Sequence, residues 1–282
     1  MPAASLQTRD LTFSYLPGSP VLRGINLEIE AGTFTAVIGQ NGSGKTTLMK
    51  HFNGLLRPQS GQVLVDGEDI SRQPVSALAR RVGYVFQNPD HQIFSASTRE
   101  EIAFGLRNLG LNEDEVQART GQTLEEFRLL PFAGRQPATL SFGLRRKVSI
   151  AAVFAMQPGL LILDEPTSGL DWKSTRELLD LLHARNRQGT TILFITHDLR
   201  LVADAIPRCL AMSAGQVTAH GATREVLANP AANGALKNGL PPVHQLAASL
   251  KDRGFPEDVF TVDDFSTAYH AAAAGSKPGG AA

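Results

Sequence analysis

The sequence has little cysteine and no excess of either charge. Its 282 residues include one cysteine, Cys209, so no disulfide can form within the chain and a reducing compartment suits it. Lysine plus arginine and aspartate plus glutamate number 27 each, so the formal net charge is zero. This balance argues against a strongly basic face, and we expect no nucleic-acid partner. No apolar run reaches the ~18 residues that cross a bilayer, so a membrane role requires a membrane partner.

A glycine-rich segment gives the clearest signal. Residues 39–46 read Gly-Gln-Asn-Gly-Ser-Gly-Lys-Thr and fit the phosphate-loop pattern G-x-x-x-x-G-K-[ST]. The β-branched apolar run 34–38 before it predicts a buried strand. Apolar residues after it recur at helical spacing until Gly54 and Pro58 end the pattern. These apolar residues are Leu48, Phe52 and Leu55.

This loop predicts nucleotide binding. Its glycines let successive N–H groups point at an anion, and the helix that follows adds its positive end. Lys45 can reach the β- and γ-phosphates, and the Thr46 hydroxyl can bind Mg²⁺. The residues expected to contact ATP here are Gly39, Asn41, Gly42, Ser43, Gly44, Lys45, Thr46 and Thr47. The alternative is a glycine-rich turn with an exposed lysine.

Strands alternate with helices along most of the chain, which predicts an α/β fold with a mostly parallel sheet and helices on both faces. The expected strands are Leu6–Phe13, Val21–Ile29, Phe34–Ile38, Val63–Val65, Val82–Phe86, Leu160–Leu163, Thr191–Ile195, Arg208–Met212 and Gln216–Ala219. The expected helices lie near Val75–Arg81, Thr98–Asn108, Glu113–Leu129, Ser141–Ala155, Trp172–Arg187, Leu246–Leu250 and Asp263–Tyr269. Within its strand, Cys209 is expected to be a small buried residue.

The pattern divides the chain into an ATPase domain and an extension. Residues 1–225 form the domain, with a helical subdomain inserted at about 87–158, where strand signals are few. Residues 226–282 form a C-terminal extension. Its end, 271–282, contains only Ala, Gly, Ser, Lys and Pro and is expected to be disordered.

Two carboxylates follow the apolar strand 160–163. Asp164 is placed to hold Mg²⁺ through water, and Glu165 to polarise the attacking water as a general base. The alternative is a strand that ends in solvated acids.

Further motifs follow in a fixed order. Tyr15 precedes the second strand, Gln87 follows the strand at 82–86, and His197 follows the strand at 191–195. Segment 140–144 reads Leu-Ser-Phe-Gly-Leu, and segment 166–171 reads Pro-Thr-Ser-Gly-Leu-Asp. Over roughly residues 6–225, the sequence resembles an ATP-binding-cassette (ABC) ATPase.

The resemblance implies a P-loop NTPase of ABC type, with an antiparallel β subdomain and a helical subdomain beside the parallel sheet. Tyr15 matches the aromatic residue that stacks on adenine, and Gln87 the Q-loop glutamine that contacts Mg²⁺ or the water. Asp171 belongs to the D-loop, and His197 matches the switch histidine that contacts the γ-phosphate. Lys45, Gln87, Glu165 and His197 are thus the implied catalytic residues, and Thr46, Gln87 and Asp164 the implied metal ligands. Taken singly, a lone Tyr or His in such a place is more often structural.

The segment at 140–144 departs from the family's LSGGQ signature, because Phe142 replaces a glycine and Leu144 a glutamine. Ser141, Gly143 and the following helix remain, and they keep the γ-phosphate site chemically possible. In the family this site acts on ATP bound to the opposite subunit, so the resemblance implies a dimer. Pairing with itself and pairing with a related chain both remain open.

Two segments narrow the resemblance. Residues 84–94, which include Gln-Asn-Pro-Asp-His-Gln-Ile-Phe, and residues 51–58 resemble the ATPases of energy-coupling-factor (ECF) importers and of related cobalt and nickel uptake systems. This resemblance implies an ATPase on the cytoplasmic face of the cell membrane that powers uptake of a vitamin or a transition-metal ion. Its partners would be a transmembrane coupling subunit, beside Ile93, Phe94 and Phe104, and a separate substrate-capture membrane subunit. Ordinary packing is the alternative for those three side chains.

Other functions remain open at this point. The alternatives are an ATPase of another ABC transporter class, a nucleic-acid or ribosome-associated ABC protein, a nucleotide-gated interaction protein, and a small-molecule P-loop kinase. The Leu246–Tyr269 region is hypothesised to help hold two ATPases together.

Overall fold

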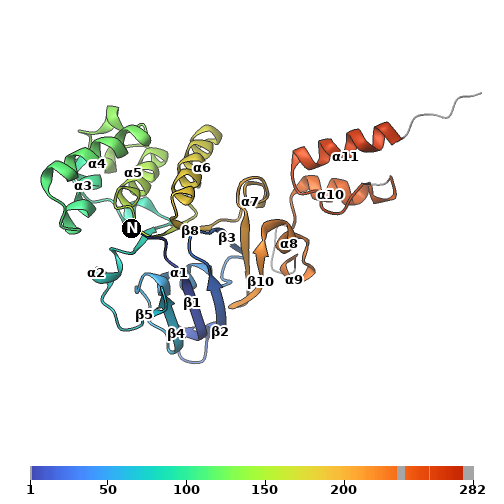
Figure 1. Cartoon of the computed structure of the whole chain (residues 1–282), viewed down its shortest axis with the longest axis horizontal. Coiled ribbons are helices and arrows are strands. Elements are labelled where there is room, and N and C mark those ends of the chain that lie inside the picture. Colours follow the sequence, from blue (N-terminus) through green and yellow to red (C-terminus); the bar gives the residue numbers. More distant parts are fainter. Residues whose placement is uncertain (1, 234–238, 254, 276–282) are drawn as a thin grey trace, which may run out of the picture.

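The computed structural model describes residues 2–233, 239–253 and 255–275 (Figure 1). A six-stranded sheet has the order β10-β9-β3-β8-β7-β6, in which β10 is antiparallel to β9 and the other pairs are parallel. Its strands are β3 (Phe34–Gly39), β6 (Val82–Val85), β7 (Leu160–Asp164), β8 (Thr191–Ile195), β9 (Arg208–Ser213) and β10 (Gln216–Ala222). Strands β7 and β8 are buried along their whole length, as continuous apolar runs in a covered parallel sheet should be.

A second, antiparallel sheet has the order β2-β1-β4-β5. Its strands are β1 (Leu6–Ser14), β2 (Pro20–Ile29), β4 (Ser60–Val65) and β5 (Glu68–Asp69). The inner side chains of β1 and β2 alternate with exposed ones and pack in one apolar cluster with helix α1 (Lys45–Phe52). The antiparallel sheet therefore lies directly against the helix that follows the phosphate loop.

The helical subdomain lies at one end of the molecule, away from the antiparallel sheet (Figure 1). Its helices are α3 (Thr98–Asn108), α4 (Glu113–Glu126) and α5 (Phe142–Ala155). Ser97 caps α3, and Asn112 with Glu115 forms a capping box on α4. Their apolar faces join the main core on the other side of the parallel sheet.

The predicted fold class is confirmed, while several element ends differ. Helix α1 ends at Phe52, so Leu55, expected on that helix, lies beyond it and is 43% exposed. The turn there depends on Gly54, whose φ is +74°. Helix α2 (Val75–Leu78) is shorter than expected, whereas α6 (Trp172–Arg187) has its expected bounds. The short helix α7 (Leu199–Ala205) was not expected.

The C-terminal extension contains α8 (Thr223–Ala228), α9 (Pro230–Asn233), α10 (Pro242–Ser249) and α11 (Val262–Gly275). The boundary expected at 225 falls inside α8, so domain and extension are continuous there. Residues 271–275, expected to be disordered, belong to α11, and the rest of that segment, 276–282, lies outside the described residues.

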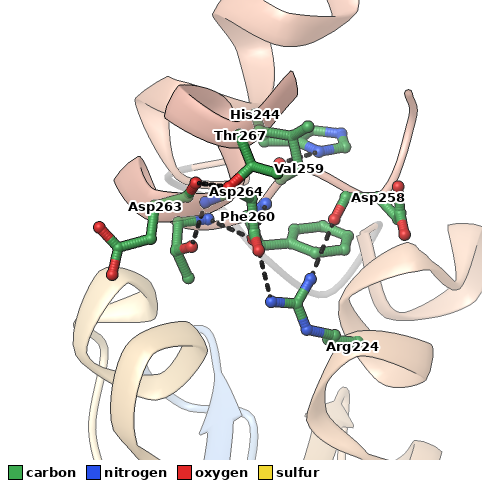
Figure 2. A network of polar contacts seen from close by, with 9 residues as sticks. Arg224, His244, Asp258, Val259, Phe260, Asp263, Asp264 and Thr267 are labelled. Carbon is green, nitrogen blue, oxygen red and sulfur yellow. Dashed lines mark hydrogen bonds and ion pairs between the residues drawn. The ribbon is translucent and has the colours of Figure 1, made fainter. Parts of the chain in front are cut away.

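A polar network ties the start of α11 and the segment before it to α8 (Figure 2). Arg224 donates to the Asp258 carbonyl at 3.2 Å and to Asp264 Oδ1 at 2.7 Å. Burial alone would raise the pKa of Asp264, but the hydrogen bonds from Arg224 and from neighbouring backbone and hydroxyl groups lower it to about 2. Beside this network, Phe260 stacks on His244 with ring centroids 4.8 Å apart, and its side chain is buried in the main core. The start of α11 is thus anchored on the ATPase domain.

No helix in the described parts of the chain is long and apolar enough to cross a bilayer. Cys209 is fully buried in β9, as expected, and burial raises the pKa of its thiol to about 12.

Candidate active site

The phosphate loop joins the end of β3 to the start of α1. Gly39 has a φ of +146°, and a Cβ there would come within 2.2 Å of the Met212 carbonyl oxygen. Gly44 caps α1 with a φ of +101°, where a Cβ would lie 3.0 Å from Leu22 Cδ2. Only glycine fits both conformation and space at these positions, which explains the loop's composition.

Lys45 is folded back onto its own loop. Its Nζ donates to the carbonyl oxygens of Gly39 and Gln40, each at 2.9 Å. Burial lowers the pKa of Lys45, although the nearby carboxylates of Glu165 and Asp164 oppose that effect. The ammonium is therefore held at the loop by neutral carbonyls, which a phosphate can replace.

Asp164, at the end of β7, faces the phosphate loop. Its Oδ2 accepts hydrogen bonds from Thr46 Oγ1 at 2.9 Å and from the Tyr84 hydroxyl at 3.2 Å. Burial raises the pKa of Asp164, and these two hydrogen bonds oppose that effect. Within the described residues, no group of three or more His, Cys, Asp and Glu side chains forms a metal cage. A hydroxyl and a carboxylate oxygen side by side fit a Mg²⁺ ion that keeps waters and phosphate oxygens as its other ligands.

Glu165 is paired with His197. Nδ1 of His197 lies 3.0 Å from each carboxylate oxygen of Glu165. The backbone of Glu165 adopts a φ of +48°, a conformation that is rare for this residue type and concentrates at functional sites. Burial raises the pKa of Glu165, against the hydrogen bond from His197. The Glu165 side chain is 13% exposed and that of His197 69%, so the histidine is free to turn towards a ligand.

An open pocket of about 500 Å³ brings these groups together. It is lined by Tyr15, Val21, Asn41, Gly42, Gly44, Lys45, Thr46, Thr47, Gln87, Asp164, Glu165 and Ile195. Gly39, Ser43 and His197 do not line it. Gly39 and His197 hydrogen-bond to the lining residues Lys45 and Glu165, and Ser43 lies between Gly42 and Gly44 in the chain. The volume suits a nucleotide-sized ligand. Most of the residues expected to contact ATP therefore converge on one site.

The signature and D-loop residues form a second surface. Ser141, Gly143 and Asp171 do not line the pocket, and the first two begin α5. The Ser141 hydroxyl makes no capping hydrogen bond on α5, so the N–H groups at this helix end keep their capacity to bind an anion. Asp171 instead caps α6, where its carboxylate accepts from the Ser174 N–H at 2.7 Å.

The altered signature residue packs against the D-loop of its own chain. A Cβ on Gly169 would lie 2.4 Å from Phe142 Cδ1, so the ring fills the space above that glycine. The guanidinium carbons of Arg145 and Arg146 lie 5.8 and 5.6 Å from the centre of the same ring. Phe142 is 40% exposed, and the rest of its ring packs against Gly169 and the two guanidinium groups.

Sequence reasoning gave no role to Tyr84 or Arg146. Arg146 is fully buried, and its guanidinium donates to the Phe86 carbonyl at 2.8 Å and to the Gln87 carbonyl. It thereby connects the signature helix to the Q-loop backbone. Helical spacing places Arg146 on the same face as the apolar Ile150 and Val153, which is the signal that could have revealed it. Tyr84 carries no such signal, because only strand pairing brings it to Asp164.

The family profile described as "ABC transporter" matches residues 22–168. The energy-coupling factor transporter ATP-binding protein EcfA2 of Symbiobacterium thermophilum is 42% identical over 272 residues, which cover 93% of this chain and 94% of that protein. Among solved structures, cbiO1 of Clostridium perfringens, part of the ABC transporter complex cbiONQ, has a TM-score of 0.72 and 36% identity, covering 88% of this chain and 96% of that one.

A second solved structure is an ATP-binding cassette dimer in a post-hydrolysis state, bound to ADP and Pi. It has a TM-score of 0.71 and 27% identity, covering 77% of this chain and 98% of that one. These similarities confirm the resemblance to ABC ATPases and to ECF ATP-binding proteins that the sequence motifs indicated. The chain belongs to the ABC transporter family of ATP-binding proteins.

Proposed function

We propose that this chain is the ATP-hydrolysing subunit of an ECF-type importer for a vitamin or a transition-metal ion. The observation that carries the proposal is the convergence of Lys45, Thr46, Asp164 and Glu165 on one pocket, in a chain similar to EcfA proteins over most of its length. The similarity to cbiO1, which is part of the ABC transporter complex cbiONQ, supports it.

The pocket supplies what phosphoryl transfer requires, which is positioning and charge stabilisation. Lys45 exchanges its loop carbonyls for the β- and γ-phosphate oxygens, and Tyr15 stacks on the adenine. Thr46 and Asp164, with Gln87, would hold Mg²⁺, which neutralises phosphate charge when bound. Glu165 accepts a proton from the attacking water, while His197 turns towards the γ-phosphate.

A second ATPase chain completes the site. Ser141, Gly143 and Asp171 lie away from the pocket of their own chain, which supports their action on ATP held by a partner. The partner is a second copy or a homologous chain. Helices α10 and α11, with Leu246 and Tyr269 exposed on them, would help hold the two chains together.

A membrane partner would dock beside the Q-loop. Phe94 and Phe104 meet edge to face with centroids 4.8 Å apart, yet they are 65% and 47% exposed. Exposed aromatic pairs of this kind serve as anchors in interface cores. A transmembrane coupling subunit would place its helices there, with a separate membrane subunit to capture the solute. The chain would then lie on the cytoplasmic face of the cell membrane.

A pull-down of the tagged chain from native membranes in mild detergent tests this proposal. We expect mass spectrometry to find a small polytopic coupling protein, and a copurifying capture subunit would indicate the solute. A matched pair of large permeases would instead place the chain in another transporter class. Recovery of soluble partners alone would favour a nucleotide-gated interaction protein and overturn the importer assignment.

A further inference from the structure

His51 is a buried polar residue that has no role in the steps above. It lies on α1, is 1% exposed, and its Nδ1 lies 2.7 Å from the Thr47 carbonyl oxygen. Nδ1 therefore carries the hydrogen and donates it. The other ring nitrogen, Nε2, is buried and makes no hydrogen bond within the described residues. Burial lowers the pKa of His51, against the effect of the Thr47 and Arg57 backbone, so the ring is neutral near pH 7.

The His51 ring takes part in a closed set of contacts. Its centroid lies 4.9 Å from that of Phe13 at an interplanar angle of 77°, and Phe13 meets Tyr15 edge-on, also at 4.9 Å. The Tyr15 hydroxyl lies 3.2 Å from Thr47 Oγ1, and Thr47 accepts the hydrogen bond from His51. We call these four residues, His51, Phe13, Tyr15 and Thr47, the Tyr15 circuit.

The Tyr15 circuit connects the two halves of the nucleotide pocket. Phe13 belongs to β1, and Tyr15 follows directly after that strand. Thr47 and His51 belong to α1, which begins within the phosphate loop. A nucleotide that places its phosphates on the loop and its base on Tyr15 must span both halves. The distance between them therefore decides whether both contacts form together.

Tyr15 needs such support because it is 56% exposed. Its ring has a fixed neighbour in Phe13, which is 9% exposed, and Phe13 in turn is fixed by the buried ring of His51. A platform of this kind binds a base more tightly when its orientation is set before the ligand arrives, because less side-chain freedom is lost on binding.

We propose that His51 is a positioning residue that fixes Tyr15 relative to the phosphate loop and thereby sets the preference of the site for a purine nucleotide over a bare phosphate chain. This rests on the proposed stacking role of Tyr15. Base–aromatic stacking and its loss on substitution are large enough to measure as a change in affinity.

The test compares ADP with pyrophosphate, which has the same number of phosphates but neither ribose nor base. Dissociation constants are measured by titration calorimetry on the full chain and on Tyr15→Ala, His51→Asn and His51→Phe. The Asn amide retains a donor near the position of Nδ1 and removes the ring, whereas Phe keeps the ring and its volume and removes the donor. Retained thermal unfolding transitions confirm that each variant is folded.

We expect His51→Asn to weaken ADP binding roughly three- to tenfold and Tyr15→Ala about tenfold, with pyrophosphate affected less than about twofold. The double variant Tyr15→Ala/His51→Asn should bind ADP no more weakly than Tyr15→Ala, because residues in one network are not additive. His51→Phe should show the smaller loss, since it keeps the contact with Phe13.

An equal loss of ADP and pyrophosphate binding in both His51 variants would mean that His51 supports the loop or the fold as a whole, and would overturn the proposal. An unchanged ratio of the two affinities in Tyr15→Ala would remove the stacking role of Tyr15, and the role of His51 with it. That outcome would leave the ATPase proposal standing, because it concerns the base and not the phosphates.

Discussion

Nδ1 of His197 lies 3.0 Å from both carboxylate oxygens of Glu165, so the side chains that follow strands β8 and β7 form a pair at one edge of the sheet. Of these two side chains, only Glu165 lines the pocket, and His197 lies beside it. Binding of a γ-phosphate would draw the exposed histidine away from Glu165 and free the carboxylate to accept a hydrogen bond from water. In the proposed mechanism, this pairing holds the carboxylate of the proposed general base in a fixed orientation.

Replacing Glu165 with Gln tests the general base. The amide keeps the shape of the side chain but cannot act as a base near neutral pH. Turnover should therefore fall by about a hundredfold or more, while ATP binding is retained. Steady-state hydrolysis and ATP titration measure the two quantities. Glu125→Gln, at an exposed position of α4, is the matched control and should change neither. Hydrolysis by Glu165→Gln near the parent rate would remove Glu165 from this role.

Asp164→Asn tests the proposed metal site. The neutral amide loses the charge that attracts Mg²⁺, so Mg²⁺-dependent hydrolysis should fall roughly 10- to 100-fold. ATP binding in the presence of EDTA should be unchanged or tighter, because a negative charge near the phosphates is gone. Tyr84→Phe removes only the 3.2 Å hydrogen bond to Asp164 and serves as the milder comparison. If Asp164→Asn weakened ATP binding equally with and without Mg²⁺, that result would contradict a metal-holding role.

Two substitutions in the altered signature should change ATPase activity in opposite directions. Ser141→Arg places a bulky cation where the partner's γ-phosphate should lie, and dimer ATPase should fall by about a hundredfold, as when a transition-state donor is removed. Leu144→Gln restores the usual family residue and should raise ATPase activity. Hydrolysis is measured at protein concentrations that favour the dimer. If neither change affected it, the signature would have no catalytic role.

The sequence predicted those parts of the site that depend on local pattern. The phosphate loop is a contiguous segment, and Asp164 and Glu165 end an apolar run, so both could be placed from neighbouring residues alone. Parallel pairing of β3, β8 and β7 then brings these segments to one edge of the sheet.

The parts that were missed depend on contacts between distant segments. Tyr84 reaches Asp164 only because β6 pairs with β7, and Arg146 reaches the Q-loop carbonyls only because α5 packs under them. The positive φ of Glu165 also has no local signal, since the residue type disfavours it. Short helices such as α7 and α8 carry too few turns for a periodic pattern to stand out.

Phe260→Ala tests how the extension is held. The ring is 1% exposed and packs in the main core, so its removal should cost about 3–5 kcal/mol of local stability. We expect faster hydrogen exchange and faster proteolysis across α10 and α11, with α1 and β3 unaffected. Val262→Ala, two residues away and 73% exposed, is the control and should change stability by less than ~0.5 kcal/mol. Unchanged exchange in Phe260→Ala would show that the extension is held elsewhere.

The burial of His51 predicts a pH dependence of stability. Burial lowers its pKa below the ordinary value of about 6.5, whereas in the unfolded chain the ring takes up a proton near that value. As the pH falls below about 6.5, the unfolded state therefore binds more protons than the folded state, and stability falls by up to ~1.4 kcal/mol per pH unit until the folded pKa is reached. Above that range this histidine contributes no pH dependence.

His51→Phe removes this titrating group and keeps a ring in the same space. The variant should therefore lose less stability than the parent chain between pH ~7.5 and ~5.5, measured as urea midpoints at each pH. Burial also lowers the pKa of His220, which is present in both proteins, so the difference between them isolates His51. The same pH dependence in both chains would mean that His51 takes up a proton as readily in the folded chain as in the unfolded chain, which would contradict the effect of burial on its pKa.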